Sequence, residues 1–306
     1  MFCIVGLIIF GILGIFSASH RELAKEAAKC VFRRVTFRAC NTTFQDKAKG
    51  KILGWLLKKS PLSAKIFNKY SEVLSWIFII LMIGSTIWVI KDIYNYYAYG
   101  SCNGLNSNSF CVFDPSGKNN QTTSLDGGCR AQAPKESNLK LAPLDLSLYP
   151  EKNQGAANQI VFIGCYTCDY TRKAYPTIQN LVKNKSVDFI FVHFPIKAEL
   201  EYITPYIYAA YRQNHEKFWQ LNDMLIASEK NVLEDKEYVL NLIKNLGFDL
   251  EKIKLLAEDE KMQNEILDSY EQIKQTGIYG TPTIFINGKA YVGPKPERVY
   301  DRALNK

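Results

Sequence analysis

Residues 163–176 read IGCYTCDYTRKAYP, and this stretch decides how the second half of the chain is interpreted. It holds two cysteines, Cys165 and Cys168, separated by two residues and preceded by the apolar run NQIVFIG at 158–164. A helical pattern follows as far as Lys183, so we expect the pair where a buried strand passes into a helix. A C-x-x-C in this position is a redox pair, half of a zinc site, or two inert core thiols.

The composition argues against zinc. A structural zinc site needs four Cys or His ligands, commonly in two spaced pairs. The chain has three histidines, His20, His193 and His215, without an H-x-x-x-H spacing, and it has no second C-x-x-C. We therefore expect no metal and no other cofactor. Because a strand-to-helix junction is a poor place to bury two inert thiols, the redox interpretation is preferred.

Thiol–disulfide exchange gives the spacing a mechanism. The thiolate is the nucleophile, and unpaired N–H groups and the helix dipole lower the pKa of a cysteine at a helix N-terminus. The neighbouring cysteine then resolves the mixed disulfide. The pattern thus predicts one attacking and one resolving sulfur.

The rest of the C-terminal half predicts an α/β core. SVDFIFVHFPI at 186–196 is typical of a second buried strand, and a long helical pattern follows, with Gly247 and Gly277 where helix C-terminal caps are expected. TPTIFING at 281–288 indicates a strand and a turn before KAYVG and a last short helix, PERVYDRAL. This order describes an α/β domain over 158–306 with a helical insertion at about 198–276.

YGTPTIFINGK at 279–289 resembles the cis-proline loop of thioredoxin-fold oxidoreductases. Together with NQIVFIG, FVHFPI and HEKFWQLNDMLIAS, it makes residues 158–302 similar to the DsbA-like branch of the thioredoxin superfamily. The resemblance implies that Pro282 faces the redox pair and that Thr281 offers backbone hydrogen bonds to an extended substrate. The alternative for Pro282 is a trans proline entering an edge strand, because few X–Pro bonds are cis in general.

One departure from the family pattern leaves two registers open. Pro176 lies eight residues after Cys168 but five after Thr171. Alignment on this proline makes Cys168 the attacking sulfur, with Thr171 in the resolving position, whereas alignment on C-x-x-C makes Cys165 the attacker. The helix N-terminus favours Cys168.

Thr171 and three further residues are expected to tune the redox pair. In this superfamily the dipeptide between the cysteines, here Tyr166 and Thr167, tunes the redox potential. Asp169 replaces the family's usual proline. It suits the first turn of a helix, but its charge raises the pKa of a neighbouring thiol. The direction of electron flow therefore stays open.

The N-terminal half predicts attachment to a membrane. Residues 1–19 hold no charged residue, and VLSWIFIILMIGSTIWVI at 73–90 is a second uncharged run, so we expect helices at 1–19 and 73–93 to cross the bilayer. Between them, residues 20–70 hold 13 basic and three acidic residues, a local charge of +10. The whole chain has a net charge of +8, so the remaining residues sum to −2. A short basic loop, here 20–72, stays on the cytoplasmic side. Contact with lipid headgroups is favoured over binding of nucleic acid.

This topology sorts the eight cysteines. Residues 94–157 show no apolar period and are expected to form a linker outside the cell membrane, where disulfides persist. A structural disulfide is expected between Cys102 and Cys111, which leaves Cys129 without an assigned partner. Cys30 and Cys40, in the basic loop, are expected to be reduced, with a regulatory pair as the alternative.

These expectations combine into a membrane-anchored, extracytoplasmic thiol–disulfide oxidoreductase. It would exchange disulfides with thiols of exported proteins, as an oxidant, and would be recharged by a membrane or soluble redox partner. An isomerase or a reductase is an alternative, because spacing does not set the potential. A different class, a non-catalytic chaperone that holds peptides against Thr281 and Pro282, is the second alternative.

Overall fold

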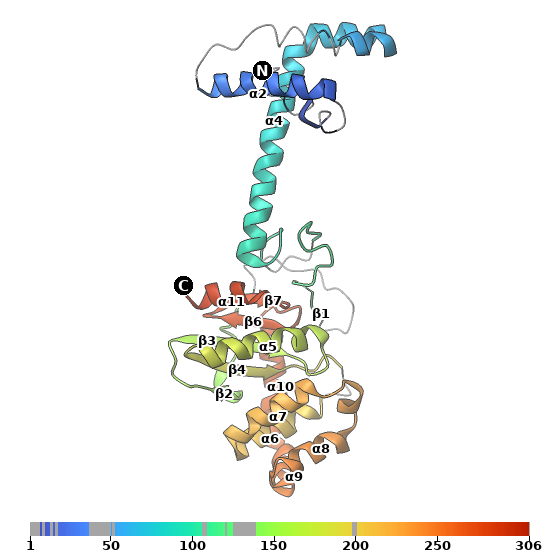
Figure 1. Ribbon diagram of the computed structural model, residues 1–306. Helices are drawn as coiled ribbons and strands as arrows, with labels where there is room; N and C mark the ends of the chain where they lie inside the picture. The colour runs from blue at the N-terminus through green and yellow to red at the C-terminus, as the bar shows by residue number, and fades with distance from the viewer. Residues whose placement is uncertain are drawn as a thin grey trace. The chain divides into compact units, whose positions relative to one another are not determined.

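The computed structural model describes residues 7, 10–12, 15, 18–36, 50, 53–105, 109–119, 121–124, 139–197 and 201–305 (Figure 1). The chain forms two compact units, Met1–Ile90 and Lys91–Lys306, and each is described by itself.

The first unit contains helix α2, Ala18–Val35, and most of helix α4, Pro61–Tyr99. Phe10, Ala27 and Cys30 are buried in a small cluster. Within the part of the chain that the structure describes, no helix combines the length and apolar content needed to cross a membrane. The expected spans at 1–19 and 73–93 are therefore not confirmed, and much of the first lies outside the described residues.

Cys30 differs from its expected state. It is 4% exposed and takes part in a disulfide, so the prediction of a reduced thiol is wrong. Cys40 lies outside the described residues.

The second unit is built on a five-stranded sheet in the order β2-β4-β3-β6-β7. Strands β3 and β4 are parallel and the other pairs are antiparallel. The strands are β2 Glu151–Lys152, β3 Asn158–Gly164, β4 Val187–His193, β6 Thr283–Ile286 and β7 Lys289–Val292. Both central strands are almost continuous apolar runs because the sheet is covered on both faces, so their buried pattern does not alternate.

Helix α5, Asp169–Asn184, connects the two parallel strands, and α11, Glu297–Leu304, packs beside it on the sheet (Figure 1). Five helices gather in the insertion that follows β4: α6 Ile203–Gln213, α7 His215–Ala227, α8 Lys236–Asn245, α9 Leu250–Ala257 and α10 Glu260–Gln275, with the short 3-10 helix η4, Asn231–Glu234. This confirms the thioredoxin-like α/β core and its helical insertion.

Local sequence explains where these elements begin and end. The side chains of Asn214, Asp235, Asp249 and Asp259 each accept a backbone N–H of the first helical turn, which satisfies a donor that the helix leaves unpaired. Gly247 and Gly277 take φ values of 74° and 77° after their helices, as their expected capping role requires.

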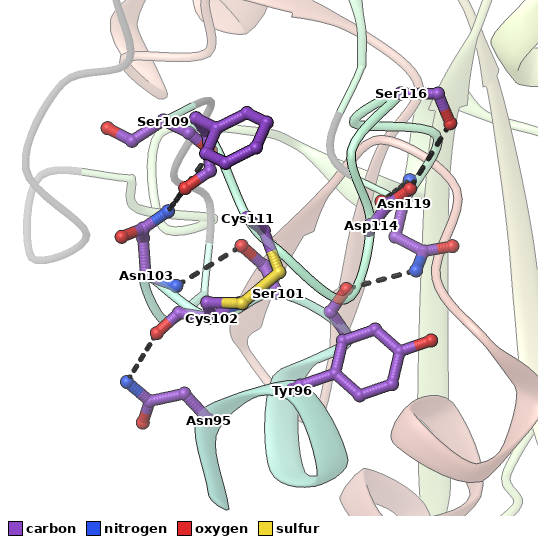
Figure 2. Close-up of a disulfide and its surroundings, with 12 residues drawn as sticks. Asn95, Tyr96, Ser101, Cys102, Asn103, Ser109, Cys111, Asp114, Ser116 and Asn119 are labelled. Atoms are coloured by element: carbon purple, nitrogen blue, oxygen red, sulfur yellow. Dashed lines mark hydrogen bonds between the residues drawn. A yellow bond between two sulfur atoms is a disulfide. The ribbon is translucent and has the colours of Figure 1, made fainter. Parts of the chain in front are cut away.

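Residues 94–157, the expected linker, contribute more structure than their composition indicates. Cys102 and Cys111 form the expected disulfide (Figure 2). The Asn119 side chain donates to the carbonyl of Gly100 at 3.0 Å. Farther along the chain come strand β1, Thr123–Ser124, the 3-10 helix η2, Leu146–Leu148, and β2. Strand β1 pairs with β5, Gly280–Thr281, in a separate two-stranded sheet.

Candidate active site

Cys168 occupies the N-cap of α5. Strand β3 ends at Gly164, and the chain turns through residues 165–167 before the helix begins at Asp169. The turn is closed by the N–H of Cys168, which donates to the carbonyl of Cys165 at 3.1 Å. The carbonyl of Cys168 accepts the N–H of Arg172 at 3.0 Å, and its side chain accepts no capping hydrogen bond. Its sulfur is therefore positioned by the first turn of the helix while remaining available to another partner.

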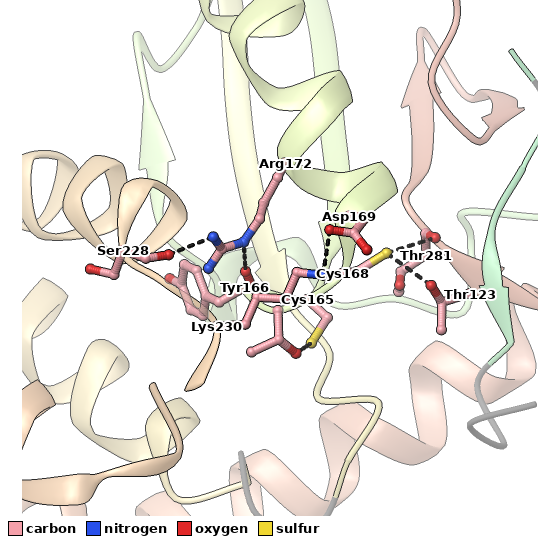
Figure 3. Close-up of polar contacts among 10 residues, drawn as sticks. Thr123, Cys165, Tyr166, Cys168, Asp169, Arg172, Ser228, Lys230 and Thr281 are labelled. Carbon is pink, nitrogen blue, oxygen red and sulfur yellow. Dashed lines mark hydrogen bonds and ion pairs between the residues drawn. The ribbon is translucent and has the colours of Figure 1, made fainter. Parts of the chain in front are cut away.

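That partner is the proline loop. The peptide bond between Thr281 and Pro282 is cis, so the alternative of a trans proline is wrong. The Sγ of Cys168 lies 3.3 Å from the carbonyl oxygen of Thr281, as Figure 3 shows. The structure thus brings together Cys168 and the loop that the family resemblance placed opposite the pair.

Cys165 lies deeper in the same turn. Its thiol is fully buried, and its Sγ is 3.4 Å from the hydroxyl of Thr167. Burial raises the pKa of Cys165, and the nearby Cys168 raises it further, while the Thr167 hydroxyl acts in the opposite direction. Both cysteines are free thiols. The two sulfurs of the motif therefore have different partners and different surroundings.

Thr171 takes the helical position that alignment on Pro176 assigned to the resolving residue. Its side chain is fully buried, and its Oγ1 accepts the N–H of Cys165 at 3.3 Å. A Cβ on Gly164 would lie 2.8 Å from the Cγ2 of Thr171, so only glycine leaves room for this packing. Thr171 thus fixes the loop that carries Cys165.

Tyr166 points into the core and away from the sulfurs. Its hydroxyl donates to the Oδ1 of Asn222 at 2.7 Å, and the Asn222 amide donates to the hydroxyl of Tyr175. The ring of Tyr166 stacks on His193, with centroids 4.5 Å apart. Tyr166 therefore ties the turn to α7, and burial raises its pKa well above the usual value.

Arg172 and Lys230 surround Asp169, and sequence reasoning missed both. Asp169 forms an ion pair with Lys230 (Figure 3). The Nε of Arg172 donates to the carbonyl of Tyr166 at 2.6 Å. Burial lowers the pKa of Arg172, and the charges of Asp169 and the two cysteines oppose that effect. The four-residue spacing of Arg172 from Cys168 on one helix face was the available signal.

Thr123 is the third residue that sequence reasoning missed. Its hydroxyl lies 3.2 Å from the Sγ of Cys168, and its backbone pairs with Thr281. No local pattern in QTTS at 121–124 indicates this contact, because it joins segments far apart in the sequence.

His193 lies beneath this turn at the end of β4. Its Nδ1 is 2.9 Å from the hydroxyl of Thr204, and burial lowers its pKa to about 3. The ring is neutral at ordinary pH and serves packing. Among the described residues, no three His, Cys, Asp or Glu side chains gather as a metal site would require.

A thioredoxin-type fold with a C-x-x-C at the start of a helix, opposite a cis proline, defines the class of thiol–disulfide oxidoreductases. Residues 130–305, a little over half of the chain, match the DSBA-like thioredoxin domain, and the chain belongs to this family.

Curated relatives match a smaller share of the chain, 42%. The Na(+)/H(+) antiporter NhaA 3 of Salinispora tropica is 25% identical over 131 residues, which are 42% of this chain and 20% of that protein. "Probable disulfide bond formation protein D" of Bacillus anthracis is 22% identical over 141 residues, 42% of this chain and 65% of that protein. The chain thus spans about a fifth of the length of the first and just under two thirds of the second.

Two solved structures overlap about half of the chain. The thiol-disulfide exchange protein alpha-DsbA2 of Wolbachia pipientis is 22% identical with a TM-score of 0.48, over 53% of this chain and 87% of that one. BdbD of Bacillus subtilis is 18% identical with a TM-score of 0.45, over 53% and 96%.

Proposed function

We propose that this protein exchanges disulfides through Cys168 and Cys165, with Cys168 as the sulfur that meets substrate. The observation that carries the proposal is the position of Cys168: at the N-cap of α5, with its Sγ 3.3 Å from the carbonyl of Thr281. As an oxidant, the protein would start with a bond between the two sulfurs. A substrate thiolate attacks Cys168 and releases Cys165. A second substrate thiolate then attacks the mixed disulfide and releases Cys168, so two electrons pass to the pair.

The surroundings of Cys165 suit the resolving role. Because burial raises its pKa, this sulfur holds its proton at neutral pH when the pair is reduced. A protonated thiol is a poor nucleophile, so it does not compete with Cys168 for an incoming disulfide.

Trapping tests the assignment. The Cys165→Ser variant should accumulate mixed disulfides through Cys168, because the resolving sulfur is gone, and peptide mapping without reductant identifies the linkage. The matched Cys168→Ser variant should accumulate none. Trapping by Cys168→Ser alone would reverse the roles, and exchange by a variant lacking both sulfurs would refute the proposal.

The proposal extends to location and partners. The exposed apolar side chains of α4, such as Ile80, Leu81 and Trp88, support attachment of the chain to a lipid bilayer. The family and the disulfide bond formation protein of Bacillus anthracis support a domain outside the cell membrane that oxidises thiols of exported proteins. A separate redox partner, membrane-bound or soluble, would re-form the Cys165–Cys168 bond. Release of the full chain from membranes by alkaline carbonate would overturn the attachment.

A further inference from the structure

Strand β1 pairs with β5, the two residues that immediately precede Pro282 in the proline loop. Thr123 pairs with Thr281 and Ser124 with Gly280, in the antiparallel direction. Thr122, just before the strand, is 8% exposed, and Thr281 is fully buried. A two-stranded sheet made only of these four residues uses the backbone edge next to Cys168, and an extended peptide adds to a sheet edge in the same way.

The side chain of Thr123 occupies the position next to the sulfur. Its Oγ1 is 3.2 Å from the Sγ of Cys168, which is 1% exposed (Figure 3). An attacking or leaving sulfur of a substrate must reach this same side of Cys168, because the other contact of the sulfur is the carbonyl of Thr281. Substrate and β1 therefore cannot be bound at once.

The pairing is also weakly held. It consists of two residues on each side. Among the described residues, the Oγ1 atoms of Thr122 and Thr281 are buried without a hydrogen-bond partner. Such unpaired groups work against the pairing, since an exposed hydroxyl would bond to water. A short strand of this kind is easily displaced by a longer peptide.

We propose that β1 is an intramolecular stand-in for substrate. It covers Cys168 until an extended polypeptide replaces it, and the reactive cysteine of that polypeptide takes the register of Thr123. This rests on the proposed function and specifies its substrate class: unfolded segments that pair antiparallel to Thr281.

Gly280 adds a requirement for the residue before that cysteine. A Cβ built on Gly280 would lie 2.6 Å from the Oγ1 of Thr122 and 2.6 Å from the carbonyl of Thr123. Gly280 pairs with Ser124 along the backbone, and the side chain in the register of Thr122 reaches across to pack against Gly280. A small side chain fits there, and a large aromatic one does not.

A cross-link tests the register. Thr123→Cys is introduced into the full chain together with Cys165→Ser and Cys129→Ser, and Ser124→Cys in the same background is the control. Glutathione disulfide is the oxidant: one thiolate displaces a glutathione from it, the second thiolate displaces the other, and two molecules of reduced glutathione leave. Neighbouring strand residues face opposite sides, so the introduced thiol at 123 should bond to Cys168 about tenfold more readily than that at 124. Equal yields, or none, would overturn the placement of β1.

Two activity measurements test displacement. The double substitution Thr122→Gly and Thr123→Gly should raise the alkylation rate of Cys168 in the reduced protein, by about tenfold, because the covering strand opens more often. An unchanged alkylation rate would refute the proposal that β1 covers Cys168. Among extended peptides with one cysteine, a threonine before it should give a higher kcat/KM than a tryptophan, and the reverse order would refute the substrate class.

These results separate the two proposals. If the thiol at 123 cross-links but neither the intact chain nor the glycine variant exchanges disulfides with any peptide, β1 is placed correctly and the proposed function fails. If peptides are oxidised but the cross-link does not form, the proposed function stands, and the proposal that β1 occupies the position of substrate is refuted.

Discussion

Cys165 and Cys168 differ through their immediate neighbours. Cys168 ends the loop at a helix N-cap and contacts the carbonyl of Thr281. Cys165 is fully buried beside Thr167, and its backbone N–H is held by Thr171. The two sulfurs of this short motif therefore differ in their contacts, although only one turn of the chain separates them.

Thr171 carries the first prediction at this scale. Thr171→Val keeps the shape of the side chain and removes the acceptor of the Cys165 N–H, leaving a buried donor unpaired. The free energy of unfolding in urea should fall by about 1–3 kcal/mol. Thr171→Ser, which restores the hydroxyl, should recover most of the loss. A loss in Thr171→Ser with none in Thr171→Val would assign the effect to packing of the methyl group instead.

His193 carries a prediction about pH. Burial lowers its pKa from 6.5 to about 3, so the unfolded chain takes up a proton in this interval and the folded chain does not. The stability that neutral His193 contributes is complete above pH 6.5 and is lost as the pH falls toward 3, at about 1.4 kcal/mol per pH unit.

His193→Gln isolates this contribution from that of the carboxylates. The difference in unfolding free energy between the native protein and the variant should shrink by roughly 2 kcal/mol between pH 7 and pH 5. Parallel curves for the two proteins would contradict it.

At the scale of elements, β3, α5 and the proline loop build the site together. Helix α5 begins just after the carboxyl end of the central strand β3, which pairs with β4 on one side. Strand β6 pairs with β3 on the other side, so the loop before β6 lies next to Cys168. Pro176 lies within α5, two turns beyond the pair, and does not end the helix. The site therefore depends on the sheet order rather than on any single loop.

Strand β5 carries the prediction at this scale. Gly280→Ala places a Cβ 2.6 Å from the backbone carbonyl of Thr123, which cannot move aside as a flexible side chain does. We expect β1 to leave, with alkylation of Cys168 several-fold faster and with kcat/KM for peptides lowered by the same clash. Gly84→Ala, where a Cβ meets nothing, is the control. Unchanged alkylation would show that β1 does not cover the sulfur.

At the scale of the whole molecule, segments far from the motif complete the site. The Cys102–Cys111 disulfide and the bond from Asn119 to Gly100 order the chain just before β1. Asp114 adds to this order by accepting the backbone N–H groups of residues 118 and 119. The segment at 100–119 thereby helps to hold Thr123 next to Cys168.

Removal of the disulfide tests this connection. The double substitution Cys102→Ala and Cys111→Ala frees a short loop, and the cross-link is worth about 2–3 kcal/mol to local order. Amides of β1 should exchange hydrogen faster and Cys168 should be alkylated faster, whereas amides of β3 should keep their protection. Ser116→Ala, on the surface of the same segment, is the control. Loss of protection across the sheet would show that the disulfide supports the core instead.

The sequence by itself determined the positions of the central strands, the helix after the pair and the hairpin at Asn287 and Gly288, because continuous apolar runs, caps and turn residues act between near neighbours. It also placed Cys165 and Cys168 where a strand passes into a helix, and the family resemblance implied a proline loop opposite them. Which sulfur faces that loop, the disulfide at Cys30 and the strand that covers Cys168 were decided only by tertiary structure. The contact of Cys168 with Thr281 and the pairing of Thr123 with Thr281 both join residues distant along the chain. Antiparallel pairing of two short polar segments has no periodicity that a sequence can display.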